Sequence, residues 1–153
     1  MELSQQIDIP LPRESVWTAL NDPDVLKQCI PGCTAFETKG DNQFEVKVTT
    51  KIGPVKASFT GDVELTALNP PESYTIIGQG QGGVAGFAKG SATVELSPSE
   101  TEGTRMTYSV TATVGGKLAQ IGSRLVDGAA KKLAAEFFKR FNEIAGAAVE
   151  DNR

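Results

Sequence analysis

Residues 116–148 read GKLAQIGSRLVDGAAKKLAAEFFKRFNEIAGAA, and this stretch decides the fold. Its apolar side chains recur at spacings of three and four residues, which is the period of an amphipathic helix. They are Leu118, Ile121, Leu125, Ala129 and Leu133, followed by Phe137, Phe138, Phe141, Ile144 and Ala148. At about 1.5 Å per residue such a helix spans roughly 45–50 Å. It therefore has to bury one face against a large apolar surface of the same domain.

The apolar stripe of this predicted helix changes direction along its length. At about 100° per residue, the stripe of the second half lies about a quarter turn from that of the first half. Gly122 and Gly128 lie where the stripe shifts, and each costs about 1 kcal/mol relative to alanine inside a helix. We expect the helix to bend or loosen there. A plain packing helix that tolerates both glycines is the alternative.

Most of the chain before this helix alternates between apolar and polar residues, the pattern of strands with one buried face. Residues 1–9 alternate except at Gln5, and Thr34 to Val114 alternates almost throughout. Turns interrupt the second segment at Gly40-Asp41-Asn42, Gly53-Pro54 and Asn69-Pro70-Pro71, and residues 98–103 form a polar loop. These breaks predict six or seven antiparallel strands connected as hairpins.

Two short helices are expected between the first strand and the rest of the sheet. Arg13–Leu20 is the first, and Asn21 or Asp22 caps a second helix with Pro23 in its first turn. The predicted fold is α+β and helix-grip: a curved antiparallel sheet wraps around the long C-terminal helix. Residues 1–148 form this single domain, and residues 149–153 form a polar C-terminal tail.

Composition excludes several classes of function. The chain has 153 residues and a net charge of −4 without a basic run, which argues against nucleic acid as a partner. It has neither a signal peptide nor an apolar run of about 20 residues, so we expect a cytoplasmic protein. Histidine, the commonest general base and transition-metal ligand, is absent. Cys29 and Cys33 flank a Pro31-Gly32 turn, and we interpret them as buried, inert thiols rather than a redox or metal pair.

The predicted inner face of the sheet is poor in side chains. Gly61, Gly78, Gly80, Gly90 and Ala92 all have the parity that faces the helix. Either the sheet bends tightly there, or space is left between sheet and helix for a ligand. We expect an apolar ligand cavity lined by Val46, Val48, Ala57, Phe59, Tyr74, Ile76, Gly78, Gly90, Ala92, Met106, Tyr108, Val110, Leu118, Ile121 and Leu125.

Few polar groups are available to this predicted cavity. The hydroxyls of Tyr74 and Tyr108 can orient a ligand by hydrogen bonding, unless both residues simply fill the core with the hydroxyl at water. Nearly every ionisable strand residue faces outward, so we predict no catalytic residue. Arg124 and Asp127 either pair at the surface, which we favour, or guard an entrance.

The run Gly78-Gln79-Gly80-Gln81-Gly82-Gly83 matches a dinucleotide fingerprint in spacing only. That fingerprint requires a following helix, whereas Val84–Leu96 reads as a strand. We interpret residues 82–86 as a flexible hairpin tip at the cavity mouth. The predicted mouth residues are Val25, Leu26, Ile30, Val84 and Phe87.

Four distinctive segments are spread over nearly the whole chain. They are residues 24–33 (DVLKQCIPGC), 51–55 (KIGPV), 86–90 (GFAKG) and 115–122 (GGKLAQIG). Together they resemble the CoxG family of aerobic carbon monoxide dehydrogenase, which belongs to the START-like, polyketide-cyclase-like superfamily of helix-grip proteins. The resemblance implies an accessory protein that couples or recruits a molybdenum-containing hydroxylase of the carbon monoxide dehydrogenase type to the cytoplasmic membrane.

Together these features predict a non-catalytic protein that carries an apolar small molecule. A bound quinone or lipid-like ligand fits, no other cofactor is expected, and contact with the inner face of the cytoplasmic membrane is transient. Two alternatives stay open: a cyclase- or hydrolase-type enzyme of the same superfamily, and a purely structural adaptor.

Overall fold

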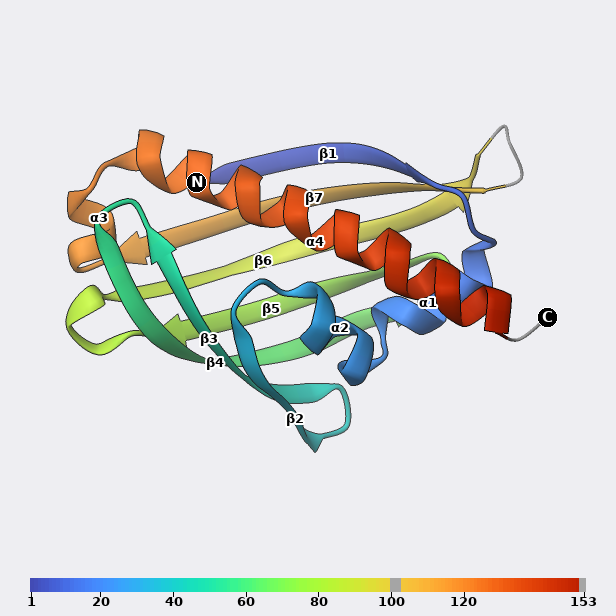
Figure 1. Cartoon of the computed structure of the whole chain (residues 1–153), viewed down its shortest axis with the longest axis horizontal. Helices are drawn as coiled ribbons and strands as arrows, with labels where there is room; N and C mark the ends of the chain where they lie inside the picture. Colours follow the sequence, from blue (N-terminus) through green and yellow to red (C-terminus); the bar gives the residue numbers. More distant parts are fainter. Residues whose placement is uncertain (100–102, 152–153) are drawn as a thin grey trace.

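The computed structural model describes residues 1–99 and 103–151 (Figure 1). The elements follow one another in the order β1 (Glu2–Ile9), α1 (Arg13–Leu20), α2 (Pro23–Cys29), β2 (Cys33–Gly40), β3 (Gln43–Ile52), β4 (Val55–Asn69), β5 (Ser73–Gln81), η1 (Gly83–Ala85), β6 (Phe87–Pro98), β7 (Thr104–Gly115), α3 (Lys117–Gln120) and α4 (Ser123–Asp151). The predicted α+β fold is confirmed.

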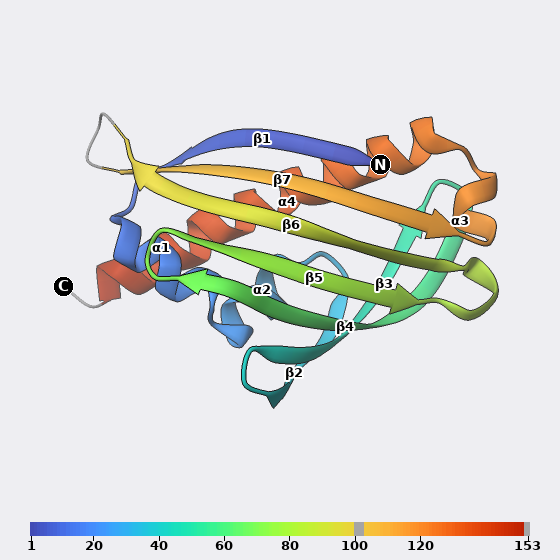
Figure 2. The same ribbon diagram turned by 180° about the vertical axis from the view of Figure 1, so that it is seen from behind.

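The strands form one antiparallel sheet in the order β1-β7-β6-β5-β4-β3-β2. All neighbours except β1 and β7 are consecutive in sequence, so hairpins build most of the sheet. The sheet is strongly curved, and α4 crosses its concave face diagonally (Figures 1 and 2). This is the helix-grip arrangement that the alternating strands and the long amphipathic helix predicted.

Local sequence signals set the start of α2. The side chain of Asp22 accepts a hydrogen bond from the backbone N–H of Asp24 at 2.9 Å, and Pro23 occupies the first turn. Of the two predicted caps, Asp22 is therefore the one used.

The prediction of one helix from Gly116 to Ala148 is wrong at its beginning. The first turn is the separate helix α3, and Gly122 breaks the chain with φ +94°, a backbone conformation that favours glycine. Gly128, by contrast, lies inside α4. The helix also continues to Asp151, so it includes the first residues of the predicted polar tail.

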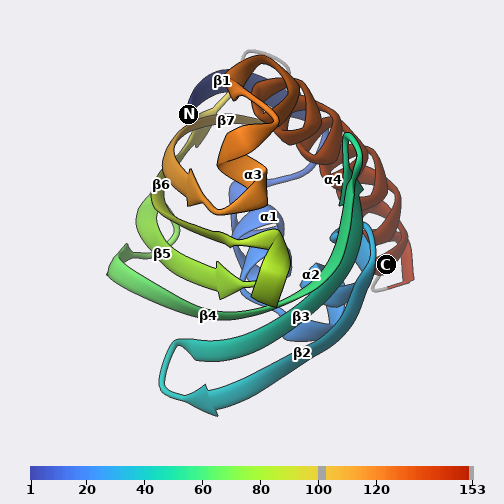
Figure 3. The same cartoon turned by 90° about the vertical axis from the view of Figure 1, so that its left-hand side faces the viewer.

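The two ends of the molecule differ in packing. At the end covered by α1, α2 and the second half of α4, side chains such as Val16, Met106 and Phe141 are at most 2% exposed. At the opposite end, Val48 and Phe59 on the inner face stay only half-buried. We call this second end the open end; it comprises the β3–β4 turn, η1, α3 and the start of α4 (Figure 3).

Candidate apolar ligand cavity

An enclosed recess of about 330 Å³ lies between the sheet and α4. Its walls are apolar apart from two tyrosines: Leu20, Leu26, Ile30, Phe36, Phe44, Val46, Val63, Leu65, Tyr74, Ile76, Ala92, Val94, Met106, Tyr108, Val110, Ala134, Phe137 and Phe138. The volume is in the range of small-molecule sites. A space of this kind suits an apolar ligand of modest size.

A second recess of about 370 Å³ adjoins the first toward the open end. The two share the wall residues Val46, Val63, Ile76, Ala92 and Val110. The second recess runs along the inner face of the sheet and is more open to solvent. Together they form an elongated apolar groove, which we call the inner cleft.

The inner glycines serve two different purposes. A Cβ at Gly61 would lie 2.9 Å from the carbonyl oxygen of Gln79, and one at Gly90 would collide with the backbone oxygen of Thr111. Close strand approach therefore requires glycine at these two positions. At Gly78 the nearest atoms to a Cβ are 3.7–3.8 Å away, an ordinary contact distance. Gly78 is thus a position that leaves volume in the inner cleft.

Most predicted cavity residues lie on the walls of the inner cleft. These are Val46, Val48, Phe59, Tyr74, Ile76, Gly78, Gly90, Ala92, Met106, Tyr108 and Val110. Four others line neither recess: Ala57, Leu118, Ile121 and Leu125. Leu118 is buried, whereas Ile121 and Leu125 approach the β3–β4 turn at Gly53. The first half of the C-terminal stripe therefore covers the open end rather than the enclosed recess.

The roof of the enclosed recess comes from the second half of α4. Ala134, Phe137 and Phe138 line it, and sequence reasoning did not assign them to the cavity. Their place on the apolar stripe was visible in the sequence. Which half of a long helix lies over a cavity depends on where the helix crosses the sheet, and the helical period does not contain that information.

Tyr74 is a polar group available to a ligand in the enclosed recess. The residue is 4% exposed and lines this recess, and its hydroxyl makes no hydrogen bond with a described residue. Its ring meets the edge of Trp17, with ring centroids 5.2 Å apart. Burial raises the pKa of the Tyr74 hydroxyl well above its ordinary value. The group therefore stays protonated and able to donate at neutral pH.

Tyr108 has a hydroxyl that is already engaged. It donates to Oε1 of Gln5 at 2.5 Å, across the β1–β7 pair. Gln5 is the residue that interrupted the alternation of the first strand, and this hydrogen bond accounts for the exception. The ring of Tyr108 stacks on Phe138, with centroids 5.3 Å apart, so it contributes an aromatic wall.

The structure does not bring the predicted mouth residues together. Leu26 and Ile30 from α2 line the enclosed recess, and Val25 packs against the core. Val84 and Phe87 lie at the open end, where η1 contacts β4 and α3. The residues of α2 are therefore cavity wall, and the opening lies between η1, α3 and the β3–β4 turn.

The favoured surface pairing of Arg124 with Asp127 is wrong. The described residues give no ion pair between them, and Oδ1 of Asp127 is buried without a hydrogen-bond partner. Asp127 lies seven residues before Ala134 and eleven before Phe138, so it points within about 20° of both. The helix therefore turns this carboxylate toward the sheet, away from Arg124.

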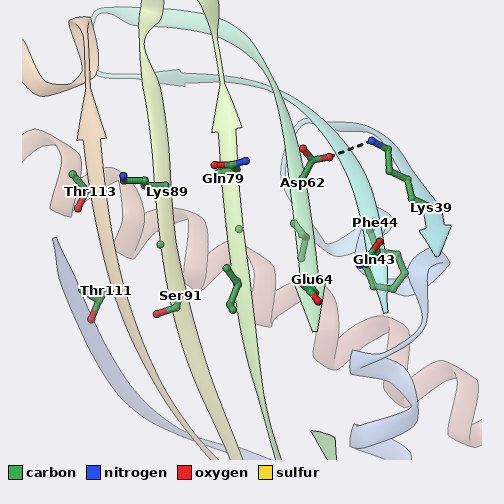
Figure 4. A pocket seen from close by; sticks show the side chains of 14 residues that line it. Lys39, Gln43, Phe44, Asp62, Glu64, Gln79, Lys89, Ser91, Thr111 and Thr113 are labelled. Atoms are coloured by element: carbon green, nitrogen blue, oxygen red, sulfur yellow. Dashed lines mark hydrogen bonds and ion pairs between the residues drawn. The ribbon is translucent and has the colours of Figure 1, made fainter. Parts of the chain in front are cut away.

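A larger hollow of about 800 Å³ lies on the outer face of the sheet, with α4 behind it (Figure 4). Polar and charged side chains line it, including Lys39, Asp62, Gln79 and Lys89. Nζ of Lys39 pairs with Asp62 at 3.3 Å and with Glu45 at 3.0 Å. This open, polar trough offers no enclosure for an apolar molecule.

The cysteines and carboxylates form no metal site within the described part of the chain. Cys29 is fully buried, and burial raises the pKa of its thiol to about 11. Cys33 is only partly buried, so the prediction of two buried thiols is right for Cys29 alone. The thiol of Cys33 donates to the carbonyl oxygen of Ala35 at 3.3 Å.

The fold and the inner cleft define the class: a helix-grip protein with an apolar interior. Solved structures share this arrangement. A conserved protein from Geobacillus kaustophilus is 33% identical, with 97% of both chains covered and a TM-score of 0.91. Proteins from Rhizobium leguminosarum and Thermus thermophilus are 12% and 18% identical, with TM-scores of 0.73 and 0.71. The alignments cover 96% and 97% of this chain, and 95% and 99% of those chains, respectively. At these identities they bear on the fold alone.

Within this class, the family model of CoxG, the G-type subunit of carbon monoxide dehydrogenase, matches residues 6–146. The chain belongs to the CoxG family, as its four motifs predicted. No curated protein gives a significant match. Among the described residues, no helix is long and apolar enough to cross a membrane.

Proposed function

We propose that this protein is a non-catalytic accessory subunit that carries a quinone-like molecule for a molybdenum hydroxylase of the carbon monoxide dehydrogenase type. The observation that carries the proposal is the enclosed apolar recess containing Tyr74, whose hydroxyl has no partner among the described residues. Membership of the CoxG family supplies the association with carbon monoxide dehydrogenase. Quinones are the membrane's own electron acceptors, which suits the partner of a redox enzyme.

The walls of the recess match the chemistry of a quinone ring. Such a ring is flat and apolar, and its carbonyl oxygens accept hydrogen bonds. Phe137, Phe138 and Tyr108 offer aromatic faces, with the Phe137 and Phe138 centroids 4.9 Å apart. Tyr74 can donate to one carbonyl oxygen. An apolar tail has room to extend along the inner cleft toward the open end.

The same walls weigh against an enzyme of the cyclase or hydrolase type. Apart from the two tyrosines, no side chain lining the enclosed recess is ionisable. General acid–base catalysis needs a proton donor or acceptor whose pKa lies near the working pH. Burial moves the pKa of both tyrosines upward, away from that range.

Fluorescence of Trp17 provides a test, because it is the single tryptophan and its ring meets that of Tyr74. Titrating menadione, a tail-less naphthoquinone, is expected to quench this emission saturably. Tyr74→Phe removes a hydrogen bond worth about 1 kcal/mol and so weakens binding about fivefold. Tyr108→Phe is the matched control, because the Tyr108 hydroxyl is committed to Gln5, and it leaves the affinity unchanged.

Two results would contradict the proposal. Quenching that rises linearly with menadione, as for free tryptophan, would mean that no site exists. Equal effects of the two tyrosine variants would remove Tyr74 from the ligand contacts. A structural adaptor predicts the first result together with intact binding to the purified hydroxylase.

A further inference from the structure

The open end concentrates the positive charge of an otherwise acidic protein. Residues 47–60, 79–91 and 111–132 build this end and its adjoining strand ends. They contain eight Lys or Arg residues and one Asp, a formal charge of +7, whereas the remainder of the chain carries −11. The eight cations, which we call the basic rim, are Lys47, Lys51, Lys56, Lys89, Lys117, Arg124, Lys131 and Lys132.

The cations of the basic rim are free to meet a partner. All eight are exposed, and none forms an ion pair with a described residue. Elsewhere, Lys39, Arg105 and Arg140 do pair with carboxylates. The carboxylates at this end are those of Asp127, which α4 turns inward, and of Glu2 on β1. The positive charge is therefore not neutralised within the described part of the protein.

Exposed apolar side chains occupy the same end. Among the described residues, the exposed large hydrophobic side chains are Ile77, Val84, Phe87 and Leu125. Three of these lie at the open end, and Val84 projects from η1 with 84% of its surface exposed. In Figure 3, η1, α3, the β3–β4 turn and the start of α4 surround the view into the molecule. Apolar tips within a ring of cations thus frame the opening of the inner cleft.

We propose that the open end docks on the anionic surface of a phospholipid bilayer, with Val84 and Phe87 entering the headgroup region. Basic side chains around apolar ones are the surface that anionic membranes bind. An acidic protein partner would match the charge but would not account for an isolated valine tip beside the mouth of an apolar cleft. The inference rests on the proposed function, because a carrier has to present its opening to the membrane.

The overall charge of −4 does not prevent this docking. Helix α4 has 29 residues and is about 43 Å long, and it runs from the open end to the packed end. At physiological ionic strength the screening length is about 8 Å. The acidic packed end therefore lies several screening lengths from the bilayer, and the basic rim governs the encounter.

Vesicle flotation tests the proposal with two charge-matched variants. Lys51→Glu with Lys117→Glu reverses two cations of the basic rim. Lys27→Glu with Lys139→Glu reverses two exposed cations outside it. Both double variants have a net charge of −8, so overall repulsion is equal. The vesicles are phosphatidylcholine alone, or phosphatidylcholine with about 30% phosphatidylglycerol, at about 0.1 M and about 1 M salt.

The wild type is expected to float with the anionic vesicles at low salt, and not with neutral vesicles or at high salt. The rim variant binds at least about 30-fold more weakly, since each lysine near an anionic surface contributes about a fivefold factor. The control variant stays within about twofold of the wild type. Absent binding, equal binding to neutral vesicles, or equal loss in both variants would overturn the proposal. So would a rim variant that keeps vesicle binding but loses the purified hydroxylase, since the rim would then recognise a protein.

Menadione quenching of Trp17 is measured on the same preparations and separates this inference from the proposed function. Intact quenching with lost flotation in the rim variant supports docking by the rim. Wild-type flotation with no quenching site would leave the docking surface standing and remove the carrier function.

Discussion

Filling the inner cleft from the sheet side separates ligand binding from stability. The change is Gly78→Leu. Gly78 lines the more open recess, and a Cβ there lies 3.7 Å from the Asp62 carbonyl oxygen and 3.8 Å from Cγ2 of Val63. No backbone atom has to move. The new side chain occupies the space that a ligand would use.

The magnitudes follow from burial. A strand glycine costs roughly 0.5–1 kcal/mol relative to alanine, and a leucine gains up to about 1.5–3 kcal/mol when fully buried. In a half-open recess we expect the free energy of unfolding to rise by about 1 kcal/mol. Displacing even two methylene-sized groups of a ligand costs about 1.6 kcal/mol, so the affinity falls roughly fifteenfold.

The assay pairs urea unfolding with binding of a long-tailed menaquinone analogue. Gln79→Leu is the control, because it adds the same side chain at the next, outward-facing position. Gly90→Leu serves as a contrast that destabilises by about 3 kcal/mol or more, since its side chain collides with the β7 backbone. Wild-type affinity in Gly78→Leu would refute the placement of the ligand. A marked loss of stability would refute the claim that this glycine leaves free volume.

The remaining predictions concern the thiol and the helix break. Because burial raises the pKa of Cys29 from 9.0 to about 11, folding favours its neutral form. The corresponding stability is complete below pH 9 and is lost as the pH rises toward 11, so the wild type loses more stability across this range than Cys29→Ala. Equal pH profiles for the two proteins would contradict this. Gly122→Ala introduces a side chain at φ +94° with no atom within 4 Å, so we expect it to destabilise by about 1–2 kcal/mol through backbone strain alone. Gly128→Ala, inside α4, should stabilise by up to about 1 kcal/mol, and calorimetry that ranks the two variants the other way would show that the helix break does not depend on Gly122.

Periodicity was enough to predict the sheet and its inward faces. A period of two fixes which side chains share a face, so Val46, Ile76 and Val110 could be assigned to the cavity before any pairing was known. The quarter-turn shift of the helical stripe located the helix break near Gly122 and Gly128. It could not distinguish them, because only Gly122 adopts a positive φ.

Features that depend on distant strands could not be predicted in this way. The hydrogen bond from Tyr108 to Gln5 joins residues 103 positions apart and requires the β1–β7 pairing. The division between Gly90, needed for strand approach, and Gly78, which leaves volume, depends on local distances between strands. The basic rim is likewise invisible in the linear sequence, because three separate segments have to meet at one end before their charges add.

The most direct test of the proposed ligand site is methyl NMR of the protein with menadione added. Ile76 and Ile77 are consecutive residues on opposite faces of β5; Ile76 lines both recesses, and Ile77 lies 48% exposed on the outer face. We predict that the methyl signals of Ile76 and Val110 shift on binding while those of Ile77 stay in place. Shifts confined to Ile77, or none at Ile76 under saturating menadione, would contradict an apolar ligand site between the sheet and α4.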